Sequence, residues 1–288
     1  MTDIKRVTVL GAGLMGHGIA QVAAQIGKYE VSLRDVEQRF VDSGMNMIKD
    51  SLQRFVKKGQ LSEAETKAIL ARIHPTLELK EAVSNSDLII EAVPENLELK
   101  KSTFREIDTH APAHAIIASN TSSVSITEMA SATKRPEKVC GMHFFNPPQL
   151  MKLVEVIKGA RTSDETVQTI LEVARKIEKE TVLVKKDSPG FIVNRILIPA
   201  LNEAVALYWE GVAERDDIDK AIKLGLNWPM GPMMLLDYIG LDTTLAISDV
   251  LTKELDPKFH ATTGLKQMVR AQLLGKKTGK GFYDWTQK

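Results

Sequence analysis

Apolar and polar positions in the first 186 residues follow two alternating patterns. Short apolar runs alternate with segments of helical period, one of which opens with Ser62 and Glu65 at the spacing of a capping box. Strands that alternate with helices indicate a parallel sheet covered on both faces. We therefore predict an α/β fold for residues 1–186, a Rossmann-like, doubly wound and mostly parallel sheet. The predicted strands are RVTVL (6–10), EVSLRD (30–35), DLIIEAV (87–93), AIIASN (115–120), KVCGMHFF (138–145), LVEVIKG (153–159) and ETVLVKK (180–186).

Residues 187–288 show only the helical period, so we predict an all-helical C-terminal domain there. Its first helix is expected within SPGFIVNRILIPALNEAVALYWEG, with Pro189 near the first turn, where proline is tolerated. The later helical segments are RDDIDKAIKLGL, MMLLDYIGLDTTLAISDVLTKEL and TTGLKQMVRAQLLG.

A glycine-rich loop joins the first predicted strand to the first helix. Gly11, Gly13 and Gly16 have the spacing that permits a tight turn, a close approach of backbone to a pyrophosphate, and close packing of helix on strand. The helix N-terminus adds N–H donors and the positive end of its dipole. Asp35 ends the next strand, 19 residues after Gly16, where a carboxylate can accept from a ribose hydroxyl. These features predict a dinucleotide site that favours NAD, while two arginines near Asp35 leave NADP open; a purely structural corner would not account for Asp35.

One histidine of six ends a predicted strand. His143 is followed directly by FFNPP, and ligands bind at the carboxyl ends of strands in open α/β sheets. If this strand pairs antiparallel with the next around Gln149, Glu155 falls opposite His143 and can fix its tautomer and stabilise the imidazolium. A cross-strand pair that only packs the sheet is the alternative that the spacing leaves open. Cys140 lies three residues earlier and faces the other side, which argues against a Cys–His nucleophile.

Two further polar segments are open to more than one interpretation. ASNTSSVSI places Asn120 and Ser122 at a strand end, where they can bind a nicotinamide ribose or a substrate oxygen, or simply cap a helix. SLQRFVKKG puts Ser51 and Lys58 on one helical face. This face can bind a phosphate-rich substrate tail, or it can simply be exposed to solvent.

Composition narrows the class of protein only slightly. The 288 residues carry 38 basic and 37 acidic side chains, so no bulk field favours nucleic acid or a membrane, and we predict neither as a partner and no metal site. The apolar segment FIVNRILIPALNEAVALYW contains charged residues and is interpreted as a buried helix. A single cysteine and the absence of a signal pattern in MTDIKR lead us to expect a cytoplasmic protein.

Five motifs taken together resemble those of one family over nearly the whole chain, in order. They are GAGLMGHGIA, SNTSS, HFFNP with LVEV, DSPGFIVNR and GKKTGKGFYDW. The chain resembles the short-chain L-3-hydroxyacyl-CoA dehydrogenases, and LRDVEQRFVDSG and KKGQL look most like the prokaryotic 3-hydroxybutyryl-CoA dehydrogenases. The resemblance implies NAD-dependent interconversion of (S)-3-hydroxyacyl-CoA and 3-oxoacyl-CoA, and a homodimer formed through the helical domain.

The resemblance also implies roles for individual residues. His143 would be the catalytic acid and base with Glu155 as its partner, and Ser122, Asn194 and Asn146 would line the substrate. Ser51 and Lys58 match coenzyme A contacts. The implied NAD contacts are Gly11, Ala12, Gly13, Leu14, Met15, Gly16, Asp35, Glu95, Lys100, Ser122, Asn146 and Lys277.

Two other functions share these features. Sugar-acid dehydrogenases of the gulonate type also carry a glycine loop, a histidine before Asn-Pro and a later glutamate, although Lys58 and the Phe144-Phe145 pair favour a CoA thioester. A non-catalytic binding protein on the same scaffold is the second alternative, which turnover of NADH would exclude.

Overall fold

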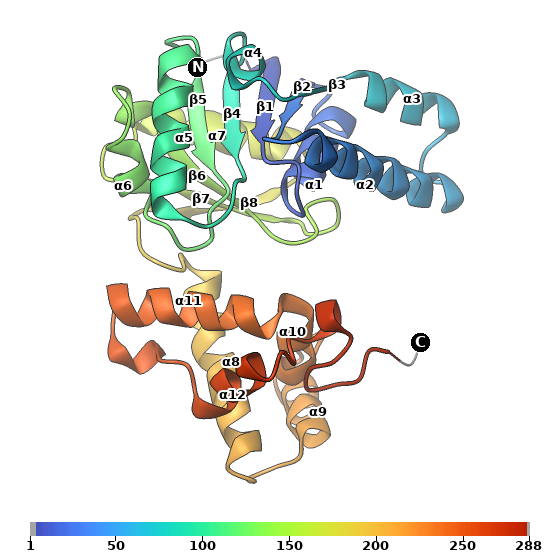
Figure 1. The fold of residues 1–288 in the computed structure, drawn as a ribbon, viewed down its shortest axis with the longest axis vertical. Helices are drawn as coiled ribbons and strands as arrows, with labels where there is room; N and C mark the ends of the chain where they lie inside the picture. The colour runs from blue at the N-terminus through green and yellow to red at the C-terminus, as the bar shows by residue number, and fades with distance from the viewer. Residues whose placement is uncertain (1–3, 287–288) are drawn as a thin grey trace. The chain divides into compact units, whose positions relative to one another are not determined.

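The sheet is 8-stranded, with the strand order β3-β2-β1-β4-β5-β6-β7-β8 (Figure 1). The first six strands run parallel, β7 is antiparallel to β6, and β8 is parallel to β7. This is the mostly parallel, doubly wound sheet that the sequence predicts. The strands are β1 (Arg6–Leu10), β2 (Glu30–Arg34), β3 (Ile73–Thr76), β4 (Leu88–Glu91), β5 (Ile116–Ser119), β6 (Val139–Phe144), β7 (Leu153–Ile157) and β8 (Glu180–Val184).

Strand β3 is absent from the strands predicted from the sequence. The strand is short, contains Pro75 and lies at the edge of the sheet beside β2. Proline is confined to edge strands because it cannot donate to the ladder. The segment IHPT also lacks the apolar run by which a strand could be identified in the sequence.

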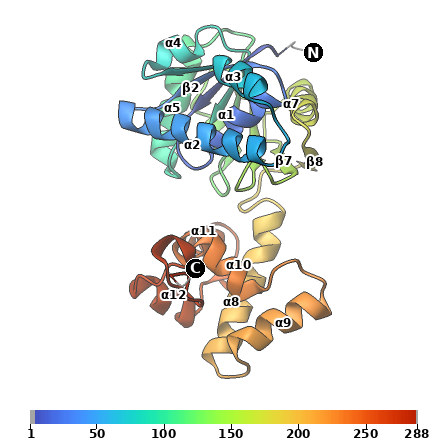
Figure 2. The ribbon, with the colours of Figure 1, turned by 90° about the vertical axis from the view of Figure 1, so that its right-hand side faces the viewer.

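Helices cover both faces of this sheet (Figures 1 and 2). Helices α1, α2, α3 and α7 pack on one face, and α4, α5 and α6 lie together on the other. Ser62 and Glu65 form the predicted capping box at the start of α3. The bounds are α1 (Gly16–Gln25), α2 (Gln38–Lys57), α3 (Glu63–Ala71), α4 (Leu79–Val83), α5 (Leu97–His110), α6 (Ile126–Ala130) and α7 (Asp164–Lys176).

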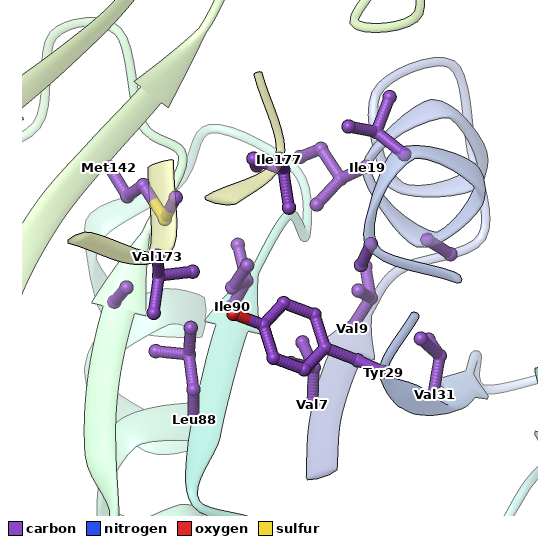
Figure 3. Packing of buried hydrophobic residues seen from close by; sticks show 14 of the residues in the cluster. Val7, Val9, Ile19, Tyr29, Val31, Leu88, Ile90, Met142, Val173 and Ile177 are labelled. Atoms are coloured by element: carbon purple, nitrogen blue, oxygen red, sulfur yellow. The ribbon is translucent and has the colours of Figure 1, made fainter. Parts of the chain in front are cut away.

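The main core of the sheet and its covering helices lies between the sheet and the layer that contains α1 and α7. Alternate residues of the central strands enter it, so residues at the intervening positions, His143 among them, point to the other face. Burial of this apolar surface supplies most of the favourable free energy that holds the layers together. Figure 3 shows part of the cluster, with Val7, Val9, Ile19, Tyr29, Val31, Leu88, Ile90, Met142, Val173 and Ile177 labelled.

The computed structural model describes residues 4–286 and separates into two units between Ser188 and Pro189. The boundary predicted from the sequence, at 186/187, lies two residues earlier. Within residues 4–286, we find no helix with both the length and the apolar character needed to cross a membrane.

The second unit is built around helix α8, against which α9, α10, α11 and α12 pack (Figure 2). Helix α8 begins at Val193, four residues after Pro189, which was predicted near its first turn; Gly190 and Phe191 have positive φ and form a turn between the proline and the helix. The predicted helix through residues 233–255 is two helices, because Gly240 has φ +97° and ends the first. The bounds are α8 (Val193–Trp209), α9 (Arg215–Gly225), α10 (Pro232–Ile239), α11 (Leu241–Glu254) and α12 (Thr263–Arg270).

A buried carboxylate fixes the end of the chain to this unit. Asp237 in α10 is 1% exposed and accepts hydrogen bonds from the backbone N–H groups of Phe282 and Tyr283 at 2.9 and 2.8 Å. The indole Nε1 of Trp285 donates to the same side chain at 2.9 Å. The side chain of Phe282 also joins the apolar core, so residues 282–285 are an integral part of the unit.

Candidate active site

The candidate site lies at the carboxyl edge of the parallel strands. Strand order reverses between β1 and β4, and ligands of open α/β sheets bind in the crevice at such a point. Because β1, β2, β4, β5 and β6 are parallel, the segments that follow them meet at this edge. Most of the residues singled out in the sequence belong to these segments.

The glycine loop after β1 is too crowded for larger residues at its two ends. Gly11 has φ +101°, and a Cβ there would lie 2.4 Å from the carbonyl oxygen of Ala92. A Cβ on Gly16 would lie 1.7 Å from the carbonyl oxygen of Gly11. At Gly13, by contrast, no described atom lies within 4 Å of the position that a Cβ would take. The loop is therefore packed on its inner side and open where a pyrophosphate would approach the backbone.

Asp35 braces this loop as well as facing the edge. Its Oδ2 accepts from the N–H of Ala12 and its Oδ1 from the N–H of Val36, each at 2.7 Å. A carboxylate oxygen has two acceptor sites, so each oxygen can still accept from a ribose hydroxyl. The residues present fit a dinucleotide of the NAD type.

The start of α1 completes the loop. His17 lies in the first turn with Nδ1 2.9 Å from the carbonyl oxygen of Gly13, and burial lowers the pKa of His17 in spite of that bond. Met15 is the N-cap residue, and Leu14 is 62% exposed on the open side of the loop.

His143 and Glu155 lie directly opposite each other in the β6–β7 ladder, as the predicted pairing around Gln149 requires. Nδ1 of His143 is 2.8 Å from Oε2 of Glu155, both residues are buried, and the ring of Phe145 lies 4.6 Å from the imidazole ring. A carboxylate can only accept, so Nδ1 carries the proton and the neutral tautomer presents Nε2 as the base. This arrangement can exchange a proton at Nε2.

The neighbours of His143 in β6 serve the core instead. Cys140 points to the opposite face, is fully buried, and burial raises the pKa of its thiol to about 12, so it offers no nucleophile. Phe144 belongs to the core cluster, which leaves Phe145 as the member of the aromatic pair beside the histidine.

The loop after β5 carries Asn120 and Ser122. Oδ1 of Asn120 accepts from the N–H of Phe144 at 2.9 Å and so ties the ends of β5 and β6 together. Glu95, in the segment after β4, accepts from the N–H and hydroxyl groups of Ser122 at 2.9 and 3.3 Å. Burial opposes ionisation of Glu95, but the Lys100 ammonium and the hydrogen bonds from this loop hold its pKa below the ordinary value. Three of the implied NAD contacts thus form one connected group.

The remaining predicted residues lie elsewhere. Asn146 is exposed just after β6, before Pro147. Ser51 is in α2, whereas Lys58 is the exposed C-cap residue of that helix, where a cation also balances the helix dipole. In the second unit, Asn194 is the second residue of α8, and Lys277 is half exposed and pairs with Asp242.

Sequence reasoning overlooked several buried polar side chains that support this edge. Glu91 and Ser119 are fully buried at the ends of β4 and β5. Lys179 is 7% exposed, and its ammonium donates to the carbonyl oxygens of Pro148 and Met151, which holds the loop between β6 and β7. A charged residue closing an apolar run, as in LIIE, is the signal that could have identified Glu91.

Comparison with known proteins places the chain in a family. The family model described as 3-hydroxyacyl-CoA dehydrogenase, NAD binding domain, matches residues 6–188, and the C-terminal domain model of the same family matches residues 190–285. The probable 3-hydroxybutyryl-CoA dehydrogenase of Bacillus subtilis is 47% identical over 287 residues, which cover 99% of each chain. The 3-hydroxybutyryl-CoA dehydrogenase of Clostridioides difficile is 47% identical over 98% of this chain and 100% of the relative.

A solved structure gives the same answer at the level of the fold. The crystal structure of (S)-3-hydroxybutyryl-CoA dehydrogenase from Ralstonia eutropha is 43% identical, with a TM-score of 0.93 over 99% of this chain and 100% of that one. The sequence resemblance is therefore confirmed over both units. The chain belongs to the 3-hydroxyacyl-CoA dehydrogenase family and is an NAD-dependent dehydrogenase.

Proposed function

We propose that the protein interconverts (S)-3-hydroxyacyl-CoA and 3-oxoacyl-CoA thioesters with NAD, and that its substrates are short, of the 3-hydroxybutyryl-CoA and acetoacetyl-CoA type. The observation that carries the proposal is the buried His143–Glu155 pair, 2.8 Å apart, beside the end of the strand that leads to Asn146. The names of the relatives support the substrate class.

His143 is the group that moves the proton. In oxidation its Nε2 accepts the proton of the 3-hydroxyl group, and in reduction it returns that proton to the 3-oxo oxygen. Glu155 holds the imidazole through Nδ1 and stabilises the imidazolium that forms, because a buried carboxylate interacts strongly with a positive charge. Ser122, Asn146 and Asn194 orient the substrate around the reacting carbon.

NAD would be held by the glycine loop from Gly11 to Gly16, by Asp35 at the ribose, and by Glu95, Asn120 and Ser122 at the nicotinamide end; the family resemblance also implies a contact with Lys277. When bound, it accepts the hydride from C3 or, as NADH, supplies it. The arrangement of Asp35 favours NAD over NADP, because its carboxylate opposes a 2′-phosphate.

Assays with a set of candidate substrates test the proposed reaction directly. We expect NADH oxidation with acetoacetyl-CoA, weaker activity with longer 3-oxoacyl-CoAs, and none with free acetoacetate or L-gulonate. Activity confined to the free acids would instead support a sugar-acid dehydrogenase. A protein that binds NADH but oxidises it with none of these substrates would be a binding protein on this scaffold.

The role of His143 needs a matched control, which the chain offers. His74 also pairs with a carboxylate, Glu30, at 2.8 Å, but at the amino ends of β2 and β3 and in an exposed position. His143→Gln should lower turnover by roughly two to four orders of magnitude, the usual contribution of a general acid–base group. His74→Gln should leave turnover unchanged. Equal activity of the two variants would refute the assignment.

We further propose that the enzyme is a cytoplasmic homodimer, with residues 1–186 binding NAD and residues 187–288 binding substrate and forming the interface. The second unit exposes large apolar side chains that a monomer would leave in water. They are Ile196, Trp209, Val212, Leu224 and Leu226, each at least half exposed. Light scattering coupled to size exclusion should give twice the 31.9 kDa chain mass, and Leu224→Glu should shift it toward the monomer. A parent protein that elutes as a monomer would contradict the interface.

A further inference from the structure

A buried ion pair stands behind the loop that carries Ser122. Glu91 is the last residue of β4 and is 0% exposed; Lys100 lies in α5 and is 1% exposed. Oε1 of Glu91 is 2.7 Å from Nζ of Lys100. Desolvation of two charges costs about as much free energy as their attraction returns, so stability alone does not explain such a pair.

The Lys100 ammonium directs all of its donors to the protein. It lies 2.7 Å from Oε1 of Glu91, 3.2 Å from the carbonyl oxygen of Val93 and 3.1 Å from Oε2 of Glu95. An ammonium group has three donors, and three acceptors surround this one. In this geometry Lys100 acts on the site through the two glutamates, Glu91 and Glu95.

Two chains of hydrogen bonds, which we call arms, run from the Glu91–Lys100 pair to the loop that carries Ser122. On one side, Oε2 of Glu91 accepts from the hydroxyl of Ser119 at 2.6 Å, and that hydroxyl accepts from the N–H of Thr121 at 3.1 Å. On the other side, Lys100 holds Glu95, whose Oε1 accepts from the N–H of Ser122 at 2.9 Å. The same oxygen accepts from the hydroxyl of Thr121 at 2.5 Å. The loop is thus fixed from two directions, and Glu91 is bonded to the first residue of each arm, Ser119 and Lys100.

We propose that Glu91 is a positioning residue for the reaction: through Ser119 on one arm and Lys100 with Glu95 on the other, it sets the place of Ser122. The inference rests on the proposed function, in which Ser122 contacts both substrate and NAD. Glu91 itself touches neither, because its carboxylate is fully buried and occupied by Lys100, Ser119 and the N–H of Val93.

Glu91→Gln is the direct test. The substitution keeps the shape but turns one acceptor oxygen into a donor, so the side chain can no longer accept from both Lys100 and Ser119, and it removes the charge that balances Lys100. Asp108→Asn is the matched control: Asp108 also lies in α5 and pairs with Arg135 at 2.7 Å, with both side chains largely buried. The control breaks an ion pair that is somewhat less buried than Glu91–Lys100 and that makes none of the described hydrogen bonds to the loop.

Two readouts separate positioning from stability. In the cofactor-free protein, hydrogen exchange measured by mass spectrometry should show the 121–124 amides exchanging at least roughly ten-fold faster in Glu91→Gln than in the parent, while Asp108→Asn matches the parent. With NADH and acetoacetyl-CoA, kcat should fall roughly ten- to hundred-fold in Glu91→Gln, the size expected when a site residue is displaced by a fraction of an ångström to an ångström. Even if Asp108→Asn loses as much thermal stability as Glu91→Gln, it should retain the kcat of the parent.

A double variant makes the test decisive. Glu91→Gln with Lys100→Met removes the uncompensated buried ammonium, so thermal stability should rise toward that of the parent. The amide exchange should nevertheless remain fast and kcat low. Recovery of kcat and amide protection together with stability would overturn the proposal, as would a Glu91→Gln variant whose exchange and kcat match those of Asp108→Asn. If the parent turned over no acyl-CoA, the proposed function would fail, while amide exchange would still decide whether Glu91 positions the loop.

Discussion

Replacing Asp35 by Ala should change the cofactor preference by an amount that the structure allows us to work out. The carboxylate makes two charge-assisted hydrogen bonds within the protein, to the N–H groups of Ala12 and Val36. Their loss loosens the glycine loop and weakens both NADH and NADPH by the same factor. The ratio of the two dissociation constants cancels that factor and reports on the ribose alone.

Two contributions to the ratio remain. NADH loses a hydrogen bond to a charged acceptor, worth about 1.5–3 kcal/mol, or roughly ten- to hundred-fold in affinity. NADPH loses no such bond and is relieved of repulsion, about 1 kcal/mol per pair of unit charges at 4 Å in water, hence about 2 kcal/mol for a doubly charged phosphate. Together they amount to about 3.5–5 kcal/mol and shift the preference toward NADPH by roughly 300- to 4,000-fold.

The assay is a fluorescence titration of each reduced cofactor, which needs no substrate. Asp42→Ala serves as the control. Asp42 is an exposed carboxylate in α2, and among the described hydrogen bonds its side chain bonds only Gln38. It should leave the ratio within about two-fold of the parent. A ratio in Asp35→Ala that stays within three-fold of the parent would show that Asp35 does not meet the ribose.

Three further outcomes are expected. Lys58→Ala should raise KM for acetoacetyl-CoA roughly five- to thirty-fold, less at high salt, while a short thioester without the nucleotide is unaffected; equal losses on both would indicate damage to α2. Cys140 should resist a thiol reagent at pH 8 in the native protein and react only on unfolding, since burial raises the pKa of its thiol to about 12; prompt labelling of the folded protein would contradict its placement. Burial opposes ionisation of Asp87, but N–H donors of Lys5 and Arg6 lower its pKa overall, so its stabilising effect is present above about pH 4 and lost as the pH falls through the folded pKa. Asp87→Asn should therefore lower the Tm at pH 7, and the difference from the parent should close below pH 4; a difference independent of pH would show that the charge of Asp87 does not stabilise the fold.

The predictions that the structure confirms rest on sequence patterns that span few residues. The opposition of His143 and Glu155 follows from the length of one hairpin, and the capping box at Ser62 from the spacing of two residues. The glycine loop was identifiable because its glycines have a regular spacing, and the clash that excludes a Cβ at Gly16 is with the carbonyl oxygen of Gly11, five residues earlier. Each of these needed only neighbouring positions and a regular period.

Features that depend on distant contacts were not visible in the sequence. Strand β3 exists because it pairs with β2, since IHPT has no strand pattern of its own. The group formed by Glu91, Lys100 and Ser119 brings together the ends of two strands and a helix, which only the sheet order makes neighbours. The break at Gly240 was missed because the apolar period continues through it.

The attachment of residues 282–285 to Asp237 has a consequence for how the chain is made. The carboxylate is synthesised 45 residues before the first of its donors, so it lacks these hydrogen bonds until residues 282–285 have been made. The hydrogen-bonded sheet, by contrast, has all its strands by residue 184 and can fold while translation continues. The helical unit can reach its native state only after residue 285, so a premature stop a few codons earlier would release a folded sheet joined to an unfinished bundle, which proteases would attack through its exposed apolar core.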